Sequence, residues 1–316
     1  MEPVILFGTF TVLLLIGTPV AFCLGAASLA TVLYMGLPPV VVFQRLNSGV
    51  SVFALMAIPF FIFAGELMVR GDIARRLVAL AGAVVGHMRG GLGQVNITAS
   101  VLFGGISGSA AADATAIGGL MIPQMKEKGY SVEYGVNVTV VSSIIALMLP
   151  PSHNMIIYSI SAGGRLSIAD LFTAGILPGL LLAVSLMVTA WFVARRAGYP
   201  TERFPGLSAL GAMFINAIPG LLLIGIIFGG VRSGVFTASE SSCIAAVYAL
   251  LVTTLAYRTM HWPEFVAATK AAVRTTAMVL LVIGCAASFG WLLAFLRIPA
   301  ELVAFMKGIS ENPLII

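Results

Sequence analysis

The chain has 316 residues, of which 59% are hydrophobic and only 9% are charged. Ordinary soluble domains carry about a quarter charged residues, so this composition excludes a water-soluble globular protein and predicts an all-α polytopic membrane protein. The net charge is +5, from seventeen basic and twelve acidic residues, and the basic residues are dispersed between apolar runs. This dispersal excludes a basic patch for nucleic acid and predicts a role in membrane orientation.

The apolar runs predict seven membrane crossings. A crossing helix needs about 20 mostly apolar residues. Met1-Glu2-Pro3 lacks the basic start of a secretory signal, so we expect the first run to be retained. That run is long enough to tilt or break, and Gly17-Thr18-Pro19 predicts a kink because proline removes a backbone donor. The crossings fall near residues 4–34, 50–69, 134–160, 171–194, 207–230, 237–257 and 275–296.

Residues 70–90 and 92–125 do not resemble ordinary crossings. Between residues 70 and 90, charged residues accompany apolar ones at helical spacing, which predicts an amphipathic arm helix at the membrane surface. The apolar positions are Ile73, Leu77, Leu80 and Val84. Within 92–125, three glycines fall between Gly104 and Gly108 and disfavour an unbroken helix. We therefore expect a re-entrant hairpin there.

The basic residues favour the hairpin over a crossing. If 92–125 enters and leaves on one side, twelve of the seventeen basic residues share a face, whereas a crossing gives nine against eight. Lys and Arg are enriched on the cytoplasmic side, so the twelve, and with them the N-terminus, are expected to be cytoplasmic. The five on the opposite face are Arg45, Arg165, Arg232, Arg297 and Lys307.

A weak internal repeat is also present. Residues 53–79 resemble residues 279–304, each an apolar span followed by an amphipathic arm, and the predicted topology runs the two copies in opposite directions. Inverted repeats are common in secondary transporters, where the binding site lies at the midplane between them. The sequence stops just as another apolar run begins at Asn312, and we expect a C-terminally truncated chain.

Two breaks in apolar segments are the candidate functional positions. Backbone leaves helical geometry in hydrocarbon only where protein or a water-filled cavity satisfies its polar groups. In the first break, Gly104 to Asp113, glycines allow close approach and Ser107 and Ser109 offer hydroxyls. In the second, Leu149 to Asn154, two prolines free carbonyl oxygens one turn earlier. Such oxygens suit sodium, and half-helix N-termini suit carboxylates.

Several titratable residues keep two interpretations. Asp113 is a costly membrane carboxylate, which serves either ion or proton coupling or a hydrogen bond that fixes the hairpin. His153 is either a ligand contact or a satisfied buried imidazole. Glu66 and Glu240, at span ends, are expected to snorkel or to cap helices. Three cysteines lie in apolar runs without the spacing of a metal site or of a disulfide framework.

Several long motifs resemble one known family. In order along the whole chain they are GTPVA at 17–21, IPFFIFAGELM at 58–68, GHMRGGLG at 86–93, FGGISGSAAAD at 103–113 and GVFTASE at 234–240. Together they resemble the DctM-type large permease subunit of tripartite ATP-independent periplasmic (TRAP) transporters.

The resemblance implies a non-enzymatic, sodium-coupled symporter of the bacterial inner membrane that imports small organic anions such as dicarboxylates by an elevator mechanism. The implied partners are a small four-helix membrane subunit and a periplasmic substrate-binding protein, with Na⁺ as coupling ion and no cofactor. The expected regions are scaffold helices 1–69, the arm 70–90, a transport domain 91–160, linking helices 161–233 and the start of a second repeat at 234–316.

The family's first sodium site falls on a set of five residues, and we place substrate and coupling residues beside it. The sodium residues are Ser107, Ser109, Ala146, Leu149 and Pro151; the others are Gly108, Asp113, Ser152, His153 and Asn154. The family usually has glycine at Ala146, which leaves a carbonyl-based site intact, and a branched apolar residue at His153, which changes the polarity beside the substrate. The family's second hairpin and second sodium site have no counterpart here, so this chain alone is not expected to transport.

Other functions stay open on the sequence. One is an anion transporter of another sodium- or proton-coupled type. From a different class, Gly105-Ile106-Ser107-Gly108 matches a Gly-x-Ser-Gly nucleophile pattern, with His153 as the base of an intramembrane serine protease. A third is a non-transporting membrane scaffold, in which no ion protects the hairpin.

Overall fold

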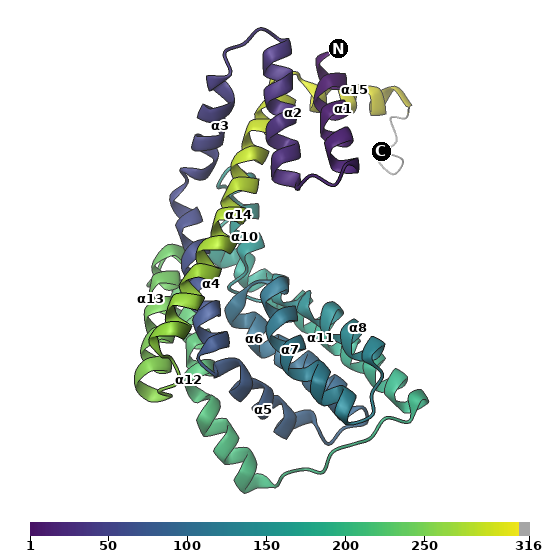
Figure 1. Cartoon of the computed structure of the whole chain (residues 1–316), viewed down its shortest axis with the longest axis vertical. Helices are drawn as coiled ribbons and strands as arrows, with labels where there is room; N and C mark the ends of the chain where they lie inside the picture. Colours follow the sequence, from purple (N-terminus) through teal and green to yellow (C-terminus); the bar gives the residue numbers. More distant parts are fainter. Residues whose placement is uncertain (310–316) are drawn as a thin grey trace. The chain divides into compact units, whose positions relative to one another are not determined.

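The computed structural model describes residues 1–309, and these form helices without any strand (Figure 1). Five helical segments in this range are long and apolar enough to cross a membrane, and a bent pair makes a sixth. The all-α polytopic membrane protein predicted from the sequence is thereby confirmed. The apolar run expected from Asn312 lies outside the described residues.

The helices are α1 (Glu2–Leu15), α2 (Val20–Tyr34), α3 (Val40–Val50), η1 (Phe53–Met56), α4 (Ala57–Arg70), α5 (Ile73–Val85), α6 (Gly91–Ser107), α7 (Ala110–Glu127), α8 (Val132–Ser143), α9 (Ile145–Met148), α10 (His153–Ser161), α11 (Ile168–Ala197), α12 (Leu207–Arg232), α13 (Ala238–Leu251), η2 (Val252–Ala256), α14 (Trp262–Phe295) and α15 (Ile298–Ile309).

The chain divides into two compact units. One consists of residues 1–53 and the described residues from 274 onward, and the other of residues 54–273. The candidate site lies wholly in the second unit. The division into scaffold, arm and transport regions remains a prediction.

The first predicted crossing, residues 4–34, is instead a pair of helices, α1 and α2, that pack against each other (Figure 1). Gly17 turns the chain with a φ of 88°, and α2 begins directly after Pro19. At 1.5 Å per residue each helix is about 21–23 Å long, which is shorter than the ~30 Å hydrocarbon core. The chain therefore returns at the end of α2 to the level at which α1 began. The expectation of a cytoplasmic N-terminus assumed a single crossing here and loses that basis.

In the first unit, α3 packs along the C-terminal part of α14. The Ser288 hydroxyl donates to the Val42 carbonyl oxygen (2.9 Å), and the Arg45 guanidinium lies 4.9 Å from the centre of the Trp291 ring. α14 begins at Trp262 and not near residue 275, so Lys270 and Arg274 belong to the helix and not to the loop before it. The two basic residues are one helical turn apart, which lets a single face of the helix carry both.

The second unit has the larger core, with Phe61, Phe103 and Phe172 fully buried. Helix α4 packs on α13, and α5 packs on α6 and α12. Three of the four apolar positions predicted for the amphipathic arm, Ile73, Leu77 and Leu80, are buried. The fourth, Val84, is 46% exposed. The arm helix is thus held within the unit along most of its length.

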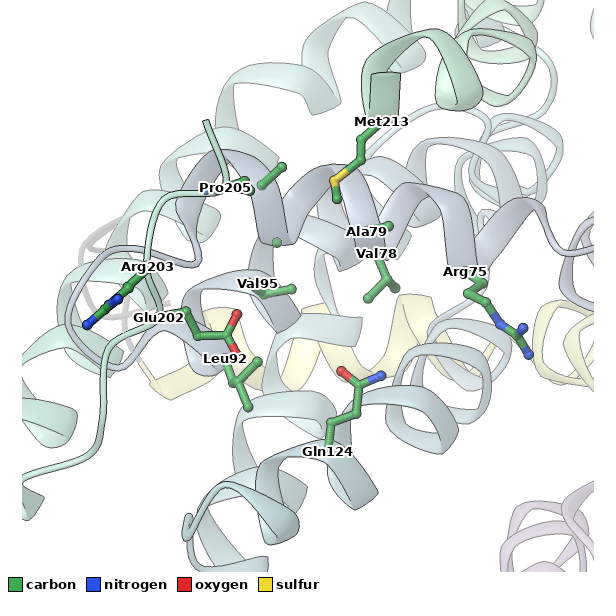
Figure 2. A pocket seen from close by; sticks show the side chains of 12 residues that line it. Arg75, Val78, Ala79, Leu92, Val95, Gln124, Glu202, Arg203, Pro205 and Met213 are labelled. Carbon is green, nitrogen blue, oxygen red and sulfur yellow. The ribbon is translucent and has the colours of Figure 1, made fainter. Parts of the chain in front are cut away.

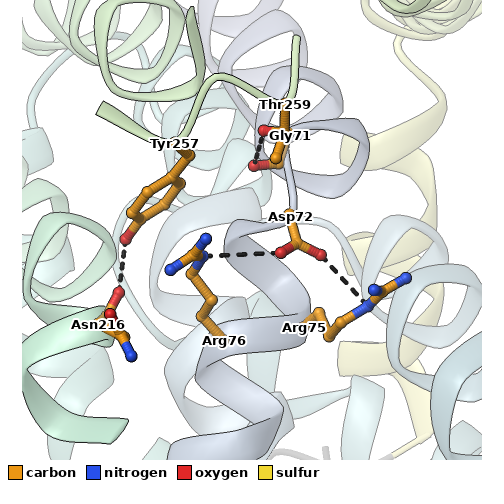
Figure 3. A network of polar contacts seen from close by, with 7 residues as sticks. All are labelled: Gly71, Asp72, Arg75, Arg76, Asn216, Tyr257 and Thr259. Carbon is orange, nitrogen blue, oxygen red and sulfur yellow. Dashed lines mark hydrogen bonds and ion pairs between the residues drawn. The ribbon is translucent and has the colours of Figure 1, made fainter. Parts of the chain in front are cut away.

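A tight joint connects α4 to α5 (Figure 3). A Cβ at Gly71 would collide with the side chain of Thr253, so only glycine allows this approach. The Thr259 hydroxyl donates to the Gly71 carbonyl oxygen (2.8 Å). The joint is therefore fixed against the segment that follows α13.

Asp72 completes the joint in a left-handed conformation, with a φ of 69°. Its carboxylate forms ion pairs with Arg75 (3.2 Å) and Arg76 (3.6 Å), and the Arg76 guanidinium lies 3.8 Å from the centre of the Tyr257 ring (Figure 3). Arg297, at the equivalent joint between α14 and α15, has a φ of 55°. A left-handed residue at both joints is compatible with the predicted repeat, which remains a prediction together with the opposite orientation of its two copies.

Candidate functional site

The predicted break in residues 92–125 is confirmed at Gly108. Helix α6 ends at Ser107, Gly108 turns the chain with a φ of 59°, and α7 begins at Ala110. Ser109 is the N-cap of α7, and its Oγ accepts a hydrogen bond from the Ala112 N–H (3.4 Å). Glycine adopts left-handed φ at no steric cost, and serine is favoured at an N-cap. Gly108 and Ser109 therefore each suit the conformation that they adopt.

The two ends of this hairpin lie at the same end of the unit. Leu92, in the first turn of α6, and Gln124, near the end of α7, line one pocket of about 330 Å³ (Figure 2). Glu202 joins the flanking loops: its N–H donates to the Gly86 carbonyl oxygen (3.3 Å), and its carboxylate pairs with Lys128 (3.3 Å). The segment thus folds back on itself. That it enters and leaves the membrane on one side remains a prediction.

We expect single cysteines at Arg89 and Lys126 to react with a membrane-impermeant maleimide from the same side of the membrane. Both positions are exposed and flank the hairpin. The measurement compares right-side-out with inverted vesicles, in a variant whose native cysteines are replaced by alanine. A cysteine at Arg165, which is exposed and predicted to lie on the opposite face, should show the reverse pattern. Reaction of positions 89 and 126 from different sides would contradict the re-entrant topology.

The second break separates α8 and α9 from α10, with a bend of 49°. Pro150 and Pro151 have no N–H, so the carbonyl oxygens four residues earlier, at Ala146 and Leu147, lack their helical donors. The Ser152 hydroxyl donates to the Leu147 carbonyl oxygen (2.6 Å). One of the two freed oxygens is therefore satisfied locally, whereas no side chain among the described residues donates to the Ala146 oxygen in this way.

The two breaks lie against each other. A Cβ at Gly108 would collide with the Pro151 carbonyl oxygen, and a Cβ at Gly104 would lie 2.8 Å from the Cα atom of Ala146. Close backbone approach therefore requires glycine at both positions. The Ser107 hydroxyl beside Gly108 is buried and has no hydrogen-bond partner among the described residues. A free hydroxyl and backbone oxygens of a broken helix are thus brought together.

The other predicted residues of the second break differ in their surroundings. Leu149 and Ser152 are buried, and Asn154 is exposed. His153 packs its ring against Phe61, with 6.4 Å between ring centres, and its Nε2 has no hydrogen-bond partner among the described residues. Because the Ser107 hydroxyl is also unpartnered, the two side chains do not form the nucleophile–base hydrogen bond of a serine protease.

Asp113 is fully buried, and its polar neighbour is Ser100 on α6. Ser100 belongs to a buried polar cluster with Asn96 on α6 and with Thr139 and Ser142 on α8. The sequence analysis did not predict this cluster, although the spacing of its residues in the sequence indicates it. Asn96 and Ser100 are four residues apart and Thr139 and Ser142 three apart, so each pair shares one face of an apolar helix.

Glu66 and Glu240 lie apart from these contacts. Glu66 pairs with Arg70 one turn later (3.5 Å). Glu240 forms a capping box with Thr237, in which the Thr237 N–H donates to the carboxylate (2.7 Å) and the Glu240 N–H donates to the threonine hydroxyl (3.2 Å). The predicted capping role of Glu240 is confirmed.

Comparison with known proteins identifies the family. Residues 7–316 match the model of the tripartite ATP-independent periplasmic transporter, DctM component. The chain is 41% identical over 99% of its length to the uncharacterised protein YgiK of Salmonella typhimurium, covering 72% of that protein. It is 37% identical over 96% of its length to the sialic acid TRAP transporter large permease protein SiaM of Vibrio cholerae, covering 71%. It is 36% identical over 94% of its length to the 2,3-diketo-L-gulonate TRAP transporter large permease protein YiaN of Escherichia coli, covering 70%.

These matches extend across both breaks and nearly the whole chain. The matched family is one of transporter permeases and not of enzymes, which removes the protease alternative. The chain therefore belongs to the DctM family, the large permease subunits of TRAP transporters.

Proposed function

We propose that this chain is the permease subunit of a sodium-coupled secondary transporter that imports small organic anions. The observation that carries the proposal is the meeting of two helix breaks inside an apolar bundle, where Gly108 lies against the Pro151 carbonyl oxygen. In hydrocarbon, irregular backbone persists only where protein or a water-filled cavity satisfies it. Secondary transporters place their ions and substrates at such broken helices.

The proposed sodium ligands are hydroxyl and backbone oxygens from both breaks. The Ser107 hydroxyl has no partner among the described residues, and the Ala146 carbonyl oxygen has lost its helical donor. Both are therefore free to bind a cation. The C-terminal end of α6 adds the partial negative charge of the helix dipole. The full proposed set is Ser107, Ser109, Ala146, Leu149 and Pro151.

The substrate is proposed to bind beside this ion, with its carboxylate at the N-terminal ends of α7 and α10. The N-terminal end of a helix carries partial positive charge, which favours an anion. His153 and Asn154 stand in the first turn of α10, whereas the Ser152 hydroxyl is already bonded to Leu147. Two relatives are named for sialic acid and for 2,3-diketo-L-gulonate, both of which are organic anions.

The working complex is proposed to be a three-component transporter of the bacterial inner membrane. The partners are a small four-helix membrane subunit and a periplasmic binding protein, in keeping with the words tripartite and periplasmic in the family description. Residues 91–160 would move as an elevator against the scaffold. Because α1 and α2 fold back, we place the N-terminus on the face of Arg45, which the charge distribution makes periplasmic.

Uptake into proteoliposomes tests this function. The complete transporter is reconstituted with its partner subunit and binding protein, and uptake of radiolabelled sialic acid, 2,3-diketo-L-gulonate and succinate is measured under inward gradients of sodium chloride or choline chloride. We expect accumulation of at least one of these anions with sodium chloride only. Accumulation in choline chloride driven by a proton gradient would contradict sodium coupling and favour the proton-coupled alternative.

A further inference from the structure

A second group of oxygen atoms lies one helical turn beyond the hairpin tip, between α6, α7 and α8. It comprises the carboxylate of Asp113 and the polar side chains of Asn96, Ser100, Thr139 and Ser142, each at most 2% exposed. No basic residue occurs in α6, α8 or α9, and the basic residue of α7, Lys126, is at its far end. None of these four helices therefore brings a basic side chain next to the carboxylate.

Hydrogen bonds connect the polar side chains of this cluster between α6 and α8. The Thr139 hydroxyl donates to the Gly135 carbonyl oxygen (2.8 Å), and the Asn96 Nδ2 donates to the Thr139 hydroxyl (2.7 Å). The Ser142 hydroxyl donates to the Asn96 Oδ1 (3.2 Å), and the Ser100 Oγ lies 3.1 Å from the Ser142 Oγ. Either hydroxyl can donate the hydrogen bond between Ser100 and Ser142. Ser100 has one further polar neighbour.

That other neighbour is Asp113. Both of its carboxylate oxygens are buried and have no hydrogen-bond partner among the described residues, and none of the ion pairs found there includes it. The Ser100 hydroxyl thus lies beside a buried carboxylate that has no ion-pair partner among the described residues. A buried carboxyl is neutral when it holds a proton, and it stays charged only beside a counter-charge such as a bound cation.

We propose that Asp113 and Ser100 hold a sodium ion at a site separate from the one at the hairpin tip. One carboxylate balances one positive charge. The described part of the chain has no group of three or more His, Cys, Asp or Glu side chains that would suit a divalent or transition metal. Carboxylate and neutral oxygens are the ligands that hard cations take, and Ser142 orients the Ser100 hydroxyl. The choice of sodium rests on the proposed function, whereas the argument for a cation rests on the burial of Asp113 without an ion-pair partner among the described residues.

An ion at this position joins the two arms of the hairpin. Asp113 belongs to α7 and Ser100 to α6, while Ser142 connects the pair to the helix that carries the second break. Ordering of the hairpin by this ion lowers the cost of ordering the tip, so the two sites are expected to fill cooperatively.

Binding of radioactive sodium to the purified full chain tests the second site. We expect the stoichiometry to fall by one ion per chain in Asp113→Asn and, separately, by one in the double variant Ser107→Ala with Ser109→Ala. Asp170→Asn, the same change at an exposed position of α11, should retain wild-type stoichiometry.

Ser100→Ala keeps the carboxylate and removes a neutral ligand. It should raise the sodium concentration for half-saturation by about tenfold or more. The matched control is Ser28→Ala, because Ser28 is also fully buried and its hydroxyl donates within its own helix to the Leu24 carbonyl oxygen (2.8 Å). Ser100→Ala also decides the question if Asp113→Asn fails to fold.

The outcomes separate this inference from the function on which it rests. Unchanged stoichiometry in a folded Asp113→Asn variant would overturn the second site and assign neutralisation of the carboxyl to a proton. Sodium binding that is lost only in the Ser107 and Ser109 variant would overturn the second site and leave sodium coupling intact. A wild-type chain that binds no sodium would overturn both.

Discussion

Replacing Gly108 with alanine is expected to abolish sodium-driven uptake. A residue with a side chain pays about 1–3 kcal/mol to hold the left-handed φ of 59° found here. Its Cβ would also collide with the Pro151 carbonyl oxygen, which is backbone and cannot rotate away. The hairpin tip must therefore withdraw from the broken helix, which separates the proposed sodium ligands. Uptake is measured in proteoliposomes at matched amounts of reconstituted protein.

Gly119→Ala is the control for this substitution. Gly119 lies in the same hairpin, on α7, and a Cβ there would meet no atom within 4 Å. Alanine inside a helix is more stable than glycine by about 0.5–1 kcal/mol, so this variant should fold and transport normally. Normal uptake by Gly108→Ala, with wild-type sodium dependence, would contradict the close contact between hairpin and broken helix.

The two breaks could be predicted because their signals are local. Glycine at 108 and the prolines at 150 and 151 restrict or free the backbone wherever they occur, whatever packs around them. The serine at 109 caps α7 for an equally local reason. The fold-back of residues 92–125 could also be predicted, since a crossing there would spread the basic residues evenly over both faces of the membrane.

The α1–α2 hairpin could not be predicted from local signals of this kind. Residues 4–34 are apolar throughout, and apolar composition does not distinguish one long tilted helix from two short ones packed together. The left-handed turn at Gly17 decides between them, and glycine permits that conformation without requiring it. The crossing predicted at 275–296 begins too late, because α14 begins at Trp262 and accommodates both Lys270 and Arg274.

The roles of individual polar side chains depended on tertiary contacts that no local pattern specifies. Ser152 lies in the predicted break, but its hydroxyl replaces the donor that Pro151 removes from Leu147. Asp113 was placed with substrate and coupling residues, and its neighbour is Ser100, thirteen positions earlier on the other arm of the hairpin. Pairings of this kind follow from which helix faces meet in the folded unit.

Removal of the tip hydroxyls is expected to weaken sodium coupling without preventing folding. Ser107 has no hydrogen-bond partner among the described residues, so Ser107→Ala breaks no bond within the protein. Ser109 caps α7, and its replacement by alanine costs about 0.5–2 kcal/mol. The double variant should therefore raise the sodium concentration for half-maximal uptake by about tenfold or more. Ser185→Ala, at an exposed serine of α11 whose hydroxyl donates to the Leu181 carbonyl oxygen (2.8 Å), is the control.

The sodium titration of uptake by Ser107→Ala alone tests the proposed tip site most directly, because this substitution removes a free oxygen and nothing else. We expect its curve to shift to higher sodium concentration at unchanged expression, while Ser185→Ala follows the wild type. A Ser107→Ala curve that coincides with the wild type would contradict a sodium site between the hairpin and the broken helix.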